Sequence, residues 1–243
     1  LPRPDDLIAL MIAEDQGGRV SETEYAKKLA EAVNNIVAKQ VELGIDCIDD
    51  GEFSKRGFAV YAHERLGGLT PTGAKRPSPW ADSREARQFP EFYGPITQEP
   101  SGAPNPSNMQ MACTEQLTYK GHDLLKRDIS NLSQAVKANN VREAFVPAIS
   151  PCDIAGNVFN EYYEDDEAFL FSIAEAMNVE YKAITEAGFL LQIDDPGLIN
   201  YYVKNPDKTV DECRTWAEKQ IEGINHALKG IPSDRVRYHT CYG

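Results

Sequence analysis

Two side chains that commonly bind metals, His239 and Cys241, are separated by one residue in the sequence. They follow the alternating segment 235–238, which is typical of a β-strand. Because side chains two apart on a strand point to the same face, we expect the imidazole nitrogen and the thiol sulfur to lie side by side. These donors suit zinc. A zinc site needs three or four protein ligands, so the pair predicts half of one; a buried cysteine next to a core histidine is the alternative.

Polar side chains follow three other short apolar segments. They are Asp50 and Glu52 after residues 45–48, Ser150 after residues 144–149, and Asp194 and Asp195 after residues 189–193. Carboxylates at such positions can bind an ammonium group or transfer protons. Asp-Gly and Asp-Pro-Gly are also ordinary turn sequences, so turn and capping roles stay open. The basic residues Lys55, Arg56 and Arg65 follow Glu52 in the chain. They could bind a substrate carboxylate or phosphate, but we interpret them as charge on a solvent-exposed face.

Helical and strand patterns alternate along the chain. Apolar residues recur at helical spacing over residues 21–43, 123–137, 167–187 and 210–228, and short apolar segments centre near residues 45, 112, 145, 190 and 236. Alternation of this kind favours a parallel sheet with helical crossovers. Polar clusters follow the strands and none is followed by a glycine-rich phosphate loop, so we predict an α/β fold of the (β/α)8 TIM barrel type. A closed barrel needs eight strands, and five are recognised.

The chain is expected to form a single domain over residues 1–243. Residues 67–110 are rich in proline and glycine, lack periodicity, and are much longer than an ordinary connection. We predict a long loop or lid there, with a disordered insertion as the alternative.

Composition limits the partners and the compartment. The net charge of -13 opposes binding to nucleic acid or to an anionic membrane. There is no apolar segment of roughly 20 residues and no secretory leader, so we expect a soluble protein. The five cysteines are odd in number and scattered, which favours free thiols in the cytoplasm. The oligomeric state is not predicted.

Four motifs of this sequence resemble segments of the catalytic C-terminal barrel of the cobalamin-independent methionine synthase family, and they occur in the same order as in that family. The resemblance is closer still to the short, single-barrel relatives of the family. They are Leu-Pro-Arg-Pro at residues 1–4, the segment 42–52 that ends in Asp-Gly-Glu, Leu-Gln-Ile-Asp-Asp-Pro at residues 191–196, and His-Thr-Cys-Tyr at residues 239–242. The resemblance implies an incomplete barrel, without its first strand and last two strands. It also implies that a Glu and a second Cys complete the zinc site beyond Gly243.

The resemblance implies zinc-dependent methyl or alkyl transfer to a thiol, like that of 5-methyltetrahydropteroyltriglutamate-homocysteine S-methyltransferase in methionine biosynthesis. The cofactor would be zinc, held by His239 and Cys241, and the partners a small thiol and a methyl or alkyl donor. Asp194 and Glu52 would be the catalytic carboxylates that bind the ammonium group of homocysteine. Asp50, Asp195 and Ser150 would complete the substrate site.

Several alternatives stay open. Residues 150–153 contain no Trp where the long enzymes stack an aromatic side chain on the folate, although Phe159 is a candidate replacement. The donor need not be a folate, and the acceptor could be another thiol, as in epoxyalkane-coenzyme M transferases. Phe159, Tyr162 and Tyr163 could line the electrophile pocket or pack in the core. A metal-free lyase or decarboxylase using Asp50 and Asp194, or a non-catalytic binding barrel, would fit the same fold.

Overall fold

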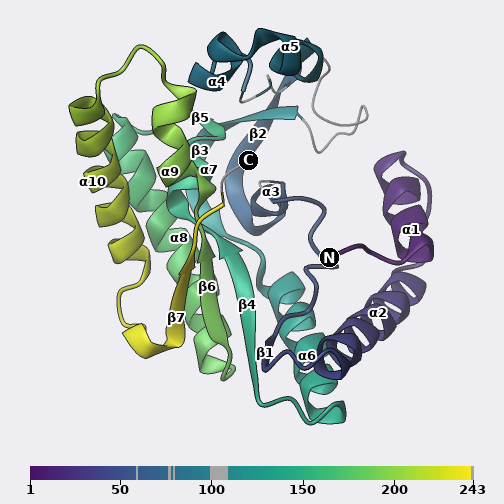
Figure 1. The fold of residues 1–243 in the computed structure, drawn as a ribbon. Helices are drawn as coiled ribbons and strands as arrows, with labels where there is room; N and C mark the ends of the chain where they lie inside the picture. Colours follow the sequence, from purple (N-terminus) through teal and green to yellow (C-terminus); the bar gives the residue numbers. More distant parts are fainter. Residues whose placement is uncertain (59, 76–77, 79, 99–108, 242–243) are drawn as a thin grey trace.

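The protein is described by a computed structural model that covers residues 1–58, 60–75, 78, 80–98 and 109–241. The elements are α1 (Asp5–Asp15), α2 (Glu22–Glu42), β1 (Cys47–Ile48), α3 (Tyr61–Arg65), β2 (Leu66–Lys75), α4 (Arg84–Gln88), α5 (Pro90–Gln98), β3 (Met109–Tyr119), α6 (His122–Ala138), β4 (Glu143–Ile149), α7 (Pro151–Ala155), β5 (Val158–Asn160), α8 (Asp166–Glu186), β6 (Leu190–Asp194), α9 (Pro196–Lys204), α10 (Val210–Ala227), a 3-10 turn (Ser233–Arg235) and β7 (Val236–His239) (Figure 1). The four helices predicted from apolar periodicity are confirmed, each within one residue at either end.

Four strands form a parallel sheet in the order β1-β4-β6-β7. Their carboxyl ends therefore meet at one edge. In this register Ile149 of β4 pairs with Asp194 of β6, and Asp194 pairs in turn with His239 of β7. The prediction of an α/β fold with a parallel sheet and helical crossovers is confirmed.

The prediction of a TIM barrel is only partly supported, because the seven strands of the described ranges form two sheets and no closed barrel. The strand near residue 112 was expected in the parallel sheet, and it lies instead in a second sheet of order β2-β3-β5. There β3 is antiparallel to β2 and parallel to β5. An apolar pattern indicates a strand but does not identify its partner.

Residues 67–110, predicted as a loop or lid, include most of β2 and the helices α4 and α5. Figure 1 shows these two helices next to each other near one end of β2. The pairing of β2 with β3 shifts register between Gly67 and Leu69 and again between Pro71 and Lys75. Such bulges break the strict alternation that identifies a strand in a sequence. The single-domain organisation stays a prediction.

Three of the long helices, α2, α8 and α10, begin at side-chain caps. The Ser21 hydroxyl accepts a hydrogen bond from the Glu24 amide at 3.3 Å, and Thr209 with Glu212 forms a complete capping box on α10. Helices α2, α6, α8 and α10 pack in succession along the main sheet (Figure 1). Among the described helices, none has the length and apolarity needed to span a bilayer.

Buried polar contacts fix the carboxyl end of β4. The Tyr61 hydroxyl accepts a hydrogen bond from the Ile149 amide at 2.7 Å, and the Tyr181 hydroxyl donates one to the Ile149 carbonyl at 2.6 Å. Next to the Tyr61 ring, the guanidinium of Arg65 forms an ion pair with Asp128 at 2.6 Å. Arg65 is only 3% exposed, so the interpretation of this residue as solvent-exposed charge was wrong. A buried charge needs such a partner to offset its loss of hydration.

Candidate active site

Asp194 lies at the centre of the carboxyl edge of the main sheet. Its side chain is 8% exposed, and its Oδ1 accepts a hydrogen bond from Gln192 Nε2 at 2.7 Å. Burial raises the pKa of the Asp194 carboxyl; the charge of Glu52 raises it further, whereas Lys55 and His239 lower it. The fold therefore brings Glu52, Asp194 and His239, predicted from three separate segments, within electrostatic reach of one another.

The loop that carries Glu52 is held in one conformation by many hydrogen bonds. The carboxyl groups of Asp49 and Asp50 accept hydrogen bonds from the amides of Gly51 (3.1 Å) and Glu52 (2.8 Å). Arg3 donates to the carbonyls of Glu52 (2.9 Å) and Phe53 (3.2 Å), and also to that of Lys55. Glu52 has a φ of 56°, in the left-handed region that a non-glycine residue rarely adopts. Such strain persists only where surrounding contacts enforce it, and it is concentrated at functional sites.

Asp50 lies beneath this loop and is 5% exposed. Burial raises the pKa of its carboxyl group to about 7, although the nearby charge of Lys55 lowers it. The side chain is therefore turned towards the loop backbone and away from solvent. A role in orienting Glu52 fits this geometry, and a direct substrate contact stays a prediction.

We expect the Asp50→Asn variant to be more stable than the wild type at pH 8. A carboxyl group whose pKa is higher in the folded than in the unfolded protein favours folding at low pH. That contribution is fully present below about pH 4 and is lost as the pH rises through about 7. Asparagine keeps the Oδ1 acceptor, so the free energy of unfolding at pH 8 should rise by about 2 kcal/mol. Urea denaturation at pH 4 to 8 measures this, and an unchanged pH dependence in the variant would contradict it.

Ser150 and Asp195 are completely buried and cap the helices that follow the sheet edge. The Ser150 hydroxyl accepts a hydrogen bond from the Asp153 amide at 3.0 Å at the start of α7. Asp195 Oδ1 accepts one from the Leu198 amide at 3.1 Å at the start of α9. Burial, together with the neighbouring charge of Asp195, raises the pKa of the Asp153 carboxyl. Both predicted substrate-binding residues thus have capping partners. The turn and capping alternative anticipated this for Asp195 but not for Ser150.

His239 and Cys241 are both exposed at the end of β7. The His239 carbonyl accepts a hydrogen bond from the Asp195 amide at 2.9 Å, and the Cys241 carbonyl accepts one from Asn200 Nδ2 at 3.1 Å. These bonds fix the backbone and leave the side chains at the edge that Asp194 occupies. Within the described part of the chain, no group of three or more His, Cys, Asp or Glu side chains could hold a metal ion. The two donors are of the type that zinc prefers, but they do not make a complete site.

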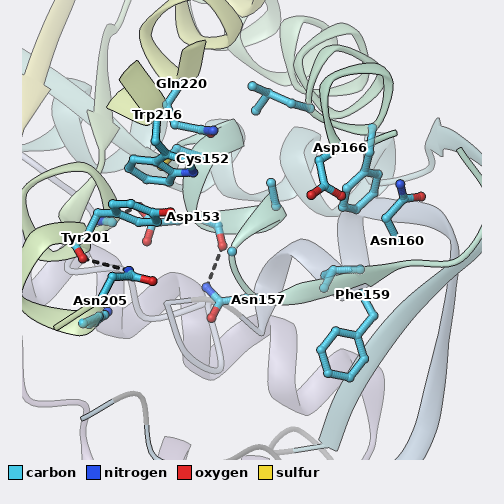
Figure 2. A pocket seen from close by; sticks show the side chains of 17 residues that line it. Cys152, Asp153, Asn157, Phe159, Asn160, Asp166, Tyr201, Asn205, Trp216 and Gln220 are labelled. Atoms are coloured by element: carbon cyan, nitrogen blue, oxygen red, sulfur yellow. Dashed lines mark hydrogen bonds between the residues drawn. The ribbon is translucent and has the colours of Figure 1, made fainter. Parts of the chain in front are cut away.

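A cavity of about 530 Å³ lies beside this edge (Figure 2). Its wall includes Asp153, Phe159, Tyr201, Trp216 and Gln220. The rings of Tyr201 and Trp216 stack with centroids 3.5 Å apart. The side chain of Gln220 is 8% exposed, and its buried Oε1 has no hydrogen-bond partner among the described residues. Because an unpaired buried amide is costly, this wall suits a ligand with polar groups.

Sequence reasoning identified only part of this cavity. Phe159 lines it as anticipated, whereas the Tyr163 hydroxyl accepts a hydrogen bond from the Leu117 amide at 2.9 Å and its ring packs against the core. Tyr162 is exposed. Trp216 and Gln220 were missed, because in the sequence they are ordinary positions of an amphipathic helix.

Comparison with known proteins identifies relatives that match almost the whole chain. The methionine synthase of Pyrococcus horikoshii is 26% identical over 243 residues, which is 99% of this chain and 59% of that protein. The 5-methyltetrahydropteroyltriglutamate--homocysteine methyltransferase of Thermotoga petrophila is 25% identical over 246 residues, 99% of this chain and 28% of that protein. The chain thus spans about three fifths of the shorter relative and less than a third of the longer one. No protein-family model matches it.

Two solved structures share the fold. A putative vitamin-B12 independent methionine synthase from Listeria monocytogenes superimposes with a TM-score of 0.69 at 22% identity, over 99% of this chain and 63% of that chain. A B12-independent methionine synthase from Shewanella, solved in complex with selenomethionine, gives a TM-score of 0.66 at 17% identity over 92% of this chain and 54% of that chain.

Proposed function

The chain is related to the cobalamin-independent methionine synthase family, and from this relationship we propose that it carries part of the active site of a methyltransferase that acts on homocysteine. The observation that carries the proposal is the pairing of Asp194 with His239 on adjacent strands. This pairing places the Asp194 carboxylate, which can bind an ammonium group, next to the His239 imidazole, which can bind a metal ion. Homocysteine has an ammonium group and a thiol on one short chain, so it matches both.

In this account Asp194 and Glu52 bind the substrate ammonium group, and the hydrogen bond from Gln192 orients Asp194. Charge-assisted hydrogen bonds of this kind fix a ligand in one orientation. Asp50 and Arg3 hold the loop that presents Glu52. These residues place the thiol without taking part in the transfer, which agrees with the shielded position of Asp194.

We further propose that His239 and Cys241 supply two ligands of a zinc site, and that the other ligands come from outside the described residues. The match is in donor type, one imidazole and one thiol, both exposed at the same sheet edge. Zinc bound there would lower the pKa of the substrate thiol and supply a thiolate at neutral pH. Within the described ranges, neither side chain forms a buried hydrogen bond that metal binding would have to break.

The curvature of the sheet supports a barrel in the complete protein. Arg237 on β7 lies over the ring of Phe145, with Cζ 4.2 Å from the centroid, and its Nη1 is 3.7 Å from Cys47 Sγ on β1. Strands β1 and β7 are the two outer strands of the sheet. In a flat sheet they would be three strand spacings apart, roughly 14 Å. The long arginine side chain spans part of this distance, and curling of the sheet, as in a barrel wall, shortens the rest.

The cavity beside the edge is our proposed entrance for the methyl or alkyl donor. Gly197, which follows the Asp194-Asp195-Pro196 segment, lines it, and so do Phe159 and Gln220. An exposed aromatic ring and an unpaired amide suit a donor with a flat, polar group.

We place the reaction in the cytoplasm, because all five cysteines are free thiols.

The test is a methyl transfer assay with the full-length protein. We expect S-methylation of homocysteine at least about 100-fold faster than of 2-sulfanylethanesulfonate, which lacks the ammonium group. Donors to compare are 5-methyltetrahydropteroyltriglutamate and its monoglutamate. Equal rates with the two thiols would contradict the assigned role of Asp194 and Glu52. A metal-free lyase that uses Asp50 and Asp194 is the second candidate, and no methyl transfer with any donor would favour it.

A further inference from the structure

Lys55 is a buried lysine at the centre of the candidate site. It is 6% exposed, although the sequence suggested a solvent-exposed charge. Its Nζ lies 3.2 Å from Glu52 Oε2 and donates a hydrogen bond to the Pro147 carbonyl on β4. It is also 4.8 Å from the centroid of the Tyr61 ring. Lysine is rarely buried so completely without a specific set of partners.

These contacts connect the loop after β1 to the neighbouring strand. The side chain of Glu52 is 39% exposed, and its carboxylate forms an ion pair with Lys55. The same ammonium group is bound by β4, which lies between β1 and β6 in the sheet. Lys55 therefore ties the Glu52 carboxylate to the strand next to β6, which ends in Asp194.

The charges around Lys55 are also unequal. Its ammonium group interacts with the carboxylates of Glu52 and Asp50, and it acts on Asp194 as well. Glu180 interacts with it as well, so one ammonium group faces four acidic side chains. Even with Asp50, whose pKa is about 7, partly protonated, the carboxylates near Lys55 outnumber it, which favours a positively charged substrate. Lysine holds Glu52 in place without neutralising the whole cluster.

We propose that Lys55 is a positioning residue that holds the Glu52 carboxylate where, together with Asp194, it binds the ammonium group of the thiol substrate. This inference rests on the proposed function. It assigns a role to a residue that does not itself contact the reacting atoms. Since Lys55 acts through Glu52, its replacement should have little effect once Glu52 has lost its charge.

A double-mutant cycle in the full-length protein tests this, with homocysteine affinity measured by calorimetry. We expect Lys55→Met to weaken binding about 10-fold, and Lys55→Arg, which keeps the charge, to restore it to within about threefold. In a Glu52→Gln background, Lys55→Met should cost less than about twofold. In the methyl transfer assay, Lys55→Met should raise KM and leave kcat nearly unchanged.

The possible outcomes separate this inference from the proposed function. If the unaltered protein does not bind homocysteine, both are overturned. Two outcomes would overturn only the role of Lys55, given that the unaltered protein binds homocysteine. In the first, Lys55→Met binds homocysteine as well as the wild type does. In the second, Lys55→Met reduces the affinity as much in the Glu52→Gln background as in the wild type. Circular dichroism checks folding. If Lys55→Met does not fold, Lys55→Gln, which can still donate a hydrogen bond, replaces it in the same cycle with the same expected non-additivity.

Discussion

Replacing Asp194 with asparagine should lower kcat/KM for homocysteine by about 100-fold to 1,000-fold, because the variant loses a charge-assisted hydrogen bond to the substrate ammonium group. The asparagine side chain has nearly the same volume and can still accept the hydrogen bond from Gln192, so the fold should be preserved. The loss should therefore be in binding and orientation. Steady-state kinetics over a range of homocysteine concentrations measures it.

Asp46→Asn is a matched control for this prediction. Asp46 is an exposed aspartate that immediately precedes β1, at the opposite edge of the sheet from Asp194. The same chemical change there should alter kcat/KM by less than about twofold. If Asp194→Asn retains more than about a third of the wild-type value while remaining folded, Asp194 does not bind the ammonium group.

The second large effect is expected for Cys241→Ser. A serine hydroxyl is a much poorer zinc ligand than a thiolate, so the variant should lose methyl transfer by at least about 1,000-fold. Because Cys241 is exposed and its side chain is not part of the core, the free energy of unfolding of the variant should be nearly that of the metal-free wild type. The assay is methyl transfer at saturating homocysteine, with denaturation curves for both proteins.

A second cysteine variant separates loss of a ligand from a general effect of removing a thiol. Cys213 is a buried residue of α10, so Cys213→Ser should cost about 1 kcal/mol of stability and leave methyl transfer intact. Equal activity of Cys241→Ser and the wild type would show that Cys241 is not needed for the reaction.

Much of the fold could be predicted from the sequence because the long helices and parallel strands follow simple periodic rules. Apolar spacing located α2, α6, α8 and α10 to within a residue. The position of Asp194 beside His239 follows from the general rule that parallel strands end at a common edge. That rule brought predicted residues together from distant segments without any knowledge of the register.

The rest depended on tertiary contacts that leave no local pattern. Strand β2 was missed because its glycines, proline and bulges hide its alternation, and β3 was assigned to the wrong sheet for want of that partner. Lys55 was interpreted as exposed charge, since nothing in the sequence indicates that Pro147 and Tyr61 enclose it. The unpaired amide of Gln220 was not recognised, because it is a feature of packing.

Zinc content is the most direct test of the central claim that His239 and Cys241 belong to a metal site. The full-length protein and its Cys241→Ser variant would be prepared without chelator and analysed by elemental mass spectrometry. The account predicts one zinc ion per chain in the wild type and none in the variant. Folded wild-type protein without zinc, or a variant that keeps its zinc, would contradict it.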